Sequence, residues 1–201
     1  MTDILPCGSW PSPLSAEAVS AASPRLDGAR FVGDEIWWGE TVAEEAGRGA
    51  VRRRGADGIV DVLPAPWSAR SRVHEYGGGS WTTTDDGALL FVEKTDQRVW
   101  MVREGDSPVA LTPGGADVRF GGLSWQHGRL LAVRETHDGS AVPPRAIVEI
   151  SLDGTVTALV GGSDFVAHPA LSPDGSRLAW IAWDHPDMAW DRSQLRVGRL
   201  E

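Results

Sequence analysis

Cysteine, lysine and long apolar segments are scarce in this sequence of 201 residues. Cys7 is the only cysteine, which excludes an internal disulfide and a cysteine-based zinc cluster. No run of about 18 apolar residues occurs, so no transmembrane helix is expected. The first residues, MTDILPCGSWPSP, lack the basic and then apolar segments of a secretory signal. We therefore expect a cytoplasmic protein in which Cys7 is an ordinary buried or half-buried thiol.

Positive charge is also in short supply. Nineteen Lys and Arg residues face 28 Asp and Glu residues, which leaves a formal net charge of −9. Lys94 is the only lysine, and the other basic residues are arginines. An acidic balance of this size argues against a general binder of nucleic acid or of anionic membranes. We expect partners of neither class.

Glycine, proline and tryptophan are abundant by contrast. The chain has 24 Gly, 13 Pro and 10 Trp, but one Tyr and four Phe. Glycine and proline interrupt regular elements, so this composition favours many short strands and turns over long helices. Six Asp-Gly pairs, which are typical of tight hairpin turns, begin at Asp27, Asp57, Asp86, Asp138, Asp153 and Asp174.

The segments between these turns form a repeated unit of four short apolar strands. One copy comprises the strands 80–84, 88–93, 98–103 and 108–112. The same order recurs at 121–125, 129–135, 146–151 and 155–160, and a weaker copy precedes both at 29–33, 35–40, 50–54 and 59–63. A last copy begins with 167–171, 177–183 and 194–199.

A four-stranded unit that repeats every 40 to 50 residues (roughly) is typical of a β-propeller blade. A small sheet with two apolar faces cannot cover either face alone, so neighbouring blades must stack. We predict an all-β protein, an incomplete propeller of about four blades with the last one truncated. The expected bounds are an N-terminal extension at 1–27, then blades at about 28–65, 76–113, 121–160 and 166–201.

The tryptophans fit such stacking. Trp81 and Trp125 are expected to end innermost strands, while Trp37, Trp100 and Trp180 lie within later strands. Packing between blades is favoured over a surface on which ligands stack, although that second interpretation stays open.

Motifs that carry chemistry are largely missing. Ser80, Ser124 and Ser163 each have a glycine two positions earlier, but none has one two positions later, so the G-x-S-x-G pattern of a serine hydrolase elbow is missing. No histidine pair has H-x-x-x-H spacing, and the segment DHPDMAWD (184–191) fits a solvated loop better than a calcium site. The Arg52–Arg54 triplet fits a solvated outer strand. We therefore predict no catalytic residue, metal or cofactor in this sequence.

The segment RSRVHEYGGGSW (70–81) stands apart from the rest. It places two cations, a histidine, a glutamate and a tyrosine directly before three glycines, which let the backbone turn sharply or approach a neighbour closely. Propeller mouths bind ligands where loops from several blades converge. Arg72, Glu75 and Tyr76 are the candidate substrate-facing residues. The competing interpretation is an Arg–Glu pair that fixes the start of a blade.

Three segments together resemble a known family. GSWPSPLSAEAV (8–19), RSRVHEYGGGSW (70–81) and LSPDGSRLAWIAWDHPDMAWD (171–191) are similar to the N-terminal propeller of prolyl oligopeptidase-family serine peptidases. The likeness is strongest to the bacterial dipeptidyl aminopeptidase/acylaminoacyl-peptidase branch. It implies a propeller that covers the active site of a C-terminal α/β-hydrolase domain and admits short peptides. No residue here matches the family's Ser-Asp-His triad, so that domain is a missing partner.

Three hypotheses follow. The resemblance favours the gating and substrate-access portion of a serine peptidase, which should not hydrolyse peptides alone because nothing in it activates a nucleophile. The alternative is a standalone propeller that binds a protein partner. A propeller that binds glycans through its tryptophans is the third hypothesis.

Overall fold

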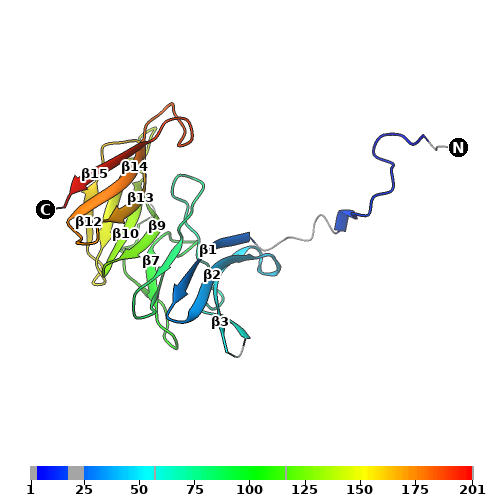
Figure 1. The fold of residues 1–201 in the computed structure, drawn as a ribbon, viewed down its shortest axis with the longest axis horizontal. Coiled ribbons are helices and arrows are strands. Elements are labelled where there is room, and N and C mark those ends of the chain that lie inside the picture. Colours follow the sequence, from blue (N-terminus) through cyan, green and yellow to red (C-terminus); the bar gives the residue numbers. More distant parts are fainter. Residues whose placement is uncertain (1–3, 18–24, 57, 116, 201) are drawn as a thin grey trace.

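The computed structural model describes residues 4–17, 25–56, 58–115 and 117–200, and its strands form four antiparallel sheets (Figure 1). Each sheet is one blade, and its strands follow one another in chain order. Blade 1 comprises β1 (Arg25–Val32), β2 (Glu35–Val42), β3 (Arg48–Gly55) and β4 (Gly58–Asp61), with a 3-10 helix at Ala43–Glu45. Blade 2 comprises β5 (Trp81–Thr83), β6 (Leu89–Val92), β7 (Val99–Val102) and β8 (Val109–Ala110).

The second half of the chain forms two more blades. Blade 3 comprises β9 (Val118–Gln126), β10 (Arg129–Thr136), β11 (Arg145–Ile150) and β12 (Val156–Val160). Blade 4 has the three strands β13 (Phe165–Leu171), β14 (Arg177–Trp183) and β15 (Gln194–Arg199). The first strand of blade 3, β9, contacts the first strands of its two neighbours, β5 of blade 2 and β13 of blade 4. Blade 1 and blade 4 lie at opposite ends of the row (Figure 1).

The predicted fold class, an all-β incomplete propeller of about four blades, is confirmed. The four sheets begin at residues 25, 81, 118 and 165. One turn prediction was wrong. Asp27 and Gly28 lie inside β1, where the register with β2 shifts between Leu26 and Ala29. Gly28 has a φ of 73°, so the pair makes a bulge in a strand instead of a hairpin turn.

Blade 2 shows why the blades stack. All four residues of β6 have no exposed surface. Because successive side chains of a strand point to opposite faces, Leu89 and Phe91 pack on blade 1 while Leu90 and Val92 pack on blade 3. Each such side chain contributes about 1.5–3 kcal/mol when it is buried fully. A strand this apolar is stable only when sheets cover both of its faces.

Blade 3 repeats the arrangement one blade further along. Leu130 and Ala132 of β10 belong to the core shared with blade 2, whereas Leu131 and Val133 belong to the core shared with blade 4. Three apolar layers therefore separate the four sheets. The layer between blades 1 and 2 contains Trp37, Val51, Leu63, Ala69, Trp81, Leu89, Phe91 and Val102.

The tryptophans follow these layers. Trp37 and Trp81 are buried between blades 1 and 2, and Trp100, Trp125 and Trp180 are partly buried against the layers. The favoured interpretation, packing between blades, therefore describes their surroundings. One detail was wrong, since Trp81 begins β5 instead of ending a strand. The carbonyls of Gly78 and Gly79, which precede it, instead accept hydrogen bonds from the β9 backbone, and β5 begins only at Trp81.

The three glycines at 77–79 bring two backbones together. The amide of Gly122 donates to the Gly78 carbonyl at 3.0 Å, and the amide of Leu123 donates to the Gly79 carbonyl at 2.8 Å. Gly79 has a φ of 54°, and a Cβ on it would lie 2.6 Å from the Gly122 Cα. Only glycine fits this approach, which joins the connection between blades 1 and 2 to the first strand of blade 3.

The N-terminal segment lies apart from the sheets. Residues 4–17 contain no strand and extend away from blade 1 in Figure 1. The remaining residues of the predicted extension before β1, 1–3 and 18–24, lie outside the described residues. Cys7 is exposed, so the expectation of a buried or half-buried thiol was wrong. Its segment does not pack on a blade. No helix in the described part of the chain has the length and apolar character that a membrane span requires.

Truncating a side chain between two blades should weaken the whole domain. We expect Leu131→Ala to lower the free energy of unfolding by about 2–5 kcal/mol, because Leu131 has no exposed surface and its loss leaves a cavity. Leu195→Ala is the control, since Leu195 is 71% exposed and should change stability by less than about 0.5 kcal/mol. Urea unfolding followed by tryptophan fluorescence measures both. Equal effects would contradict the two-sided packing of β10.

The glycine contact gives a second test. Gly79→Ala should destabilise the protein by about 1–3 kcal/mol more than Gly139→Ala, because its new Cβ would overlap the Gly122 backbone. Gly139 is a matched control: its φ is 87°, but a Cβ there meets no atom within 4 Å. Both variants share the cost of a left-handed backbone, so their difference isolates the close approach. Similar unfolding midpoints in urea would show that the contact is unimportant.

Candidate functional site

Three charged side chains lie side by side at one end of blade 3. Antiparallel register pairs Glu135 of β10 with Arg119 of β9 on one side and with Arg145 of β11 on the other. Directly opposite residues in neighbouring strands have close side chains, so this register produces an Arg–Glu–Arg row.

Glu135 is the centre of the row, and its side chain is only 1% exposed. Arg145 donates from Nε to Oε2 at 2.7 Å, and His137 Nε2 lies 2.7 Å from Oε1. The backbone amide of His74 also donates to Oε2, at 3.1 Å. Arg145 in turn donates to the Asp164 carbonyl at 2.9 Å. One buried carboxylate thus connects the blade 1–2 connection, blade 3 and the start of blade 4.

These partners keep Glu135 charged. Burial by itself raises the pKa of a carboxyl group, because it removes water from the ionised form. Hydrogen bonds from the His74 amide and His137, with the charge and hydrogen bond of Arg145, outweigh burial and hold the pKa of Glu135 below its usual value. The row therefore carries an ionised carboxylate between two guanidinium groups at neutral pH.

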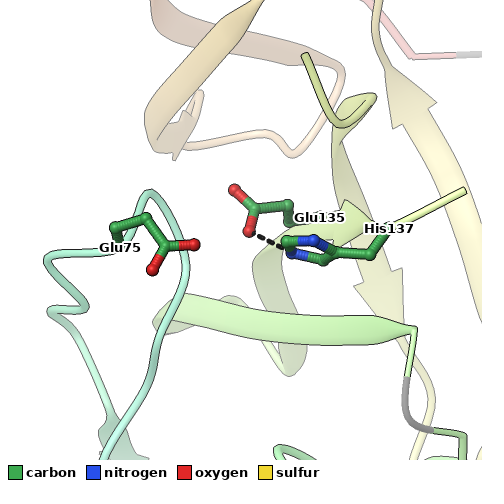
Figure 2. A group of neighbouring side chains, drawn as sticks. All are labelled: Glu75, Glu135 and His137. Atoms are coloured by element: carbon green, nitrogen blue, oxygen red, sulfur yellow. Dashed lines mark hydrogen bonds and ion pairs between the residues drawn. The ribbon is translucent and has the colours of Figure 1, made fainter. Parts of the chain in front are cut away.

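Glu75 faces this row from the connection between blades 1 and 2. Figure 2 shows its carboxylate on the loop opposite Glu135 and His137. Arg119 donates from Nη1 to Glu75 Oε1 at 2.6 Å and to the Arg72 carbonyl at 3.3 Å. The same nitrogen lies 3.6 Å from Glu135 Oε1. The Glu75 side chain is 73% exposed, so it presents a carboxylate to solvent at the edge of a buried ion-pair network.

His74 lies on the inner side of the same loop. Its ring meets Phe165 and Trp183 of blade 4 edge-on, at centroid distances of 5.5 and 5.8 Å. Burial, with the nearby charge of Arg145, lowers the pKa of His74 to about 4 against the opposing effect of Glu135. The ring is therefore neutral at pH 7, as its aromatic surroundings require.

The three predicted site residues do not converge on one point. Glu75 joins the row through Arg119, whereas Arg72 joins it only through its carbonyl. The Arg72 guanidinium donates instead to the carbonyls of Lys94 and Thr95, in the β6–β7 connection.

Tyr76 has a different setting. It is 80% exposed and lines a cavity of about 340 Å³ between blades 1 and 2. Asp27, Glu40 and Arg70 also line this cavity, which opens beside the glycines that follow Tyr76. Tyr76 therefore lines a cavity whose lining does not include Glu75.

Glu75, Glu135 and His137 also have the composition of a metal site. One ligand atom from each lies within 4.8 Å of the others. However, the Arg119 guanidinium already forms ion pairs with Glu75 and Glu135, and the Arg145 guanidinium forms one with Glu135. Two positive charges balance two negative ones, so the electrostatics favour the ion-pair network over a divalent cation. We assign no metal to this cluster.

The arginine triplet and the segment 184–191, which the sequence also singled out, have structural roles. Arg52 pairs with Glu40 at 2.7 Å and with Asp61 at 2.8 Å, so this arginine is more than a solvated outer residue. The segment 184–191 forms the connection between β14 and β15, as expected of a loop. Within this segment, the backbone amide of His185 donates a hydrogen bond to the carboxylate of Asp164, which precedes β13, at 2.9 Å.

Sequence reasoning missed Arg119, Glu135 and Arg145. Glu135 did leave one signal, because it follows the apolar run LLAV (130–133) by two residues within one expected strand, and a buried charge needs a partner. Its partners lie 16 and 10 residues away in the sequence, and only the register of β9, β10 and β11 makes them neighbours.

Removing the central charge should be costly. We expect Glu135→Gln to lower the free energy of unfolding by about 3–5 kcal/mol at pH 7, because Arg145 would keep a buried charge without its partner. Glu149→Gln is the control, since the Glu149–Arg129 pair is about a quarter exposed and should contribute less than about 1 kcal/mol.

The effect of Glu135→Gln on the free energy of unfolding should depend on pH. A carboxyl group whose pKa is lower in the folded state stabilises the fold above its unfolded pKa, about 4.3. This stabilisation is lost as the pH falls through the lower folded value. The stability difference between wild type and Glu135→Gln should therefore shrink below about pH 4. Urea unfolding at pH 3 and pH 7 checks this, and a constant difference would contradict it.

Comparison with known proteins adds to this geometry. No family model and no curated protein sequence matches the chain. Among solved structures, a Mycobacterium tuberculosis puromycin-hydrolyzing peptidase is 40% identical with a TM-score of 0.86, over 98% of this chain and 33% of that one. A puromycin hydrolase is 34% identical with a TM-score of 0.84, over 100% of this chain and 34% of that one.

A more distant match concerns the fold alone. An oligogalacturonate lyase has 12% identity and a TM-score of 0.59, over 82% of this chain and 48% of that one. The chain spans about a third of the length of the two puromycin-hydrolysing proteins that it matches. By its sheets and by this identity, the chain is similar to a propeller portion of these puromycin-hydrolysing peptidases, in agreement with the resemblance to the prolyl oligopeptidase family.

Proposed function

We propose that this chain is the gating and substrate-positioning wall of a cytoplasmic serine peptidase that cleaves short peptides. Within its family, we place it in the dipeptidyl aminopeptidase/acylaminoacyl-peptidase branch. The observation that carries the proposal is the 34–40% identity to puromycin-hydrolysing proteins over nearly the whole chain. Puromycin joins an amino acid to a nucleoside through an amide, so its hydrolysis is the same chemistry as cleavage of a small peptide.

The proposal assigns chemistry and access to different portions of one enzyme. The sequence contains no G-x-S-x-G elbow, so the nucleophile would come from an α/β-hydrolase portion, the partner expected from the family. A propeller built from closely packed blades supplies a rigid wall beside that portion. Its contribution would be to exclude large chains and to orient small ones.

Glu75, Arg72 and Tyr76 are the residues that we propose to face the substrate. The Glu75 carboxylate is 73% exposed and can accept hydrogen bonds from the free amino group of a peptide. Arg72 offers an exposed guanidinium for a substrate carboxylate, and Tyr76 offers an exposed ring beside its cavity. All three come from one short loop, which is how a propeller presents several functional groups together.

A chimaera tests the assignment. This chain would replace the segment that it matches in the Mycobacterium tuberculosis puromycin-hydrolyzing peptidase. We expect the chimaera to hydrolyse puromycin and this chain alone to release no product, because the chain lacks an activated nucleophile. The parent enzyme and a version without the matched segment are the controls. A folded chimaera without activity would contradict the proposed function.

Within an active chimaera, Glu75 should determine amine recognition. We expect Glu75→Gln to lower kcat/KM for a dipeptide with a free amino group by about tenfold or more, since it removes one charge-assisted hydrogen bond. Glu104→Gln is the matched control, because Glu104 is 79% exposed and also pairs with an arginine, Arg53. Unchanged kcat/KM in Glu75→Gln would remove Glu75 from the substrate site.

The mass of the native product separates the two leading functions. Immunoblotting or mass spectrometry of the source cells should detect this sequence in a protein well above 21.6 kDa. A product of 21.6 kDa would favour the alternative, a standalone propeller that binds a protein partner.

A further inference from the structure

We propose that Arg119 is the positioning residue for Glu75, so that this arginine sets how the proposed site recognises an amine. The inference rests on the proposed function for its ligand, but its geometry belongs to the described residues alone.

The loop that carries Glu75 has an unfavourable backbone. His74 has a φ of 57° and Glu75 a φ of 63°, and neither is a glycine. The left-handed region is unfavourable for each of two consecutive non-glycine residues, because the Cβ atom crowds the following carbonyl oxygen. Such a conformation persists only where surrounding contacts determine it. The contacts that hold this loop therefore determine the position of the Glu75 carboxylate.

Those contacts come from blade 3. Glu135 accepts the His74 amide at 3.1 Å, which fixes the start of the left-handed pair. Arg119 Nη1 donates to the Arg72 carbonyl, which precedes the left-handed pair, and to Oε1 of Glu75, the second residue of that pair. The Arg72 carbonyl also accepts the Glu75 amide at 3.1 Å. One guanidinium nitrogen thus closes the turn and orients the carboxylate at its end.

Arg119 is itself held in place. Its strand position is opposite Glu135, and its Nη1 lies 3.6 Å from that buried carboxylate. The Arg119 side chain is 21% exposed, while that of Glu75 is 73% exposed. A partly buried cation therefore holds an exposed anion, which is the arrangement expected when the anion meets the ligand and the cation does not.

The physical consequence concerns binding more than chemistry. Without Arg119, the Glu75 side chain would be free to rotate and its backbone would relax from the left-handed region. A substrate amine would then have to order this carboxylate when it binds, which costs conformational entropy. The loss should therefore appear in KM for substrates with a free amine, and amine-blocked substrates should not detect it.

The first experiment uses the 201-residue chain itself. Hydrogen exchange of the Glu75 amide should accelerate by about tenfold or more in Arg119→Ala, while core amides such as that of Leu131 keep their wild-type rates. Arg103→Ala is the matched control, because Arg103 pairs with an exposed carboxylate, Asp86, at a different place in the structure. An unchanged Glu75 rate in Arg119→Ala would overturn the proposal.

The second experiment uses the chimaera described above. Arg119→Ala should raise KM for a free dipeptide about tenfold and change kcat by less than about twofold, and KM for the N-acetylated peptide should stay unchanged. Arg119→Lys, which keeps the charge, should restore part of the lost affinity. Equal losses on both peptides would show a merely structural role and overturn the proposal. An inactive wild-type chimaera would instead reject the proposed function, and the exchange rates would still decide whether Arg119 positions Glu75.

Discussion

The two middle blades of this protein have to be covered on both faces, and the rest of the structure depends on that constraint. The four residues of β6 have no exposed surface although they alternate between two faces. A single sheet of this composition would leave apolar side chains in water on one side. The blades therefore stack in chain order, and the tryptophans are placed mostly where two sheets meet.

Stacking forces the connections between blades to cross a crowded centre. The connection between blades 1 and 2 passes so close to β9 that Gly79 meets the backbone of Gly122. Buried polar groups beside that crossing also need partners. Glu135 supplies them: its carboxylate accepts from the His74 amide and from Arg145, and Arg145 reaches the carbonyl of Asp164. The candidate site thus grows from the electrostatics that hold three blades together.

The same network has one exposed end. Glu135 is buried between two guanidinium groups, whereas Glu75 reaches solvent beyond Arg119. A rigid interior that holds a polar group at its rim is the arrangement that substrate positioning requires.

Local sequence patterns were sufficient for the strands, their order and the propeller, because alternation and turn residues act over a few neighbours. The proposal for Glu75 also began from a local pattern, the glycines that follow this residue. Local patterns were insufficient for Asp27-Gly28, which reads as a turn but lies within β1, since pairing with β2 outweighs local preference. They could not find Arg119 and Arg145, because only strand register brings these residues to Glu135. A repeated pattern is local in the chain, whereas a charge and its partner meet only when the blades have formed.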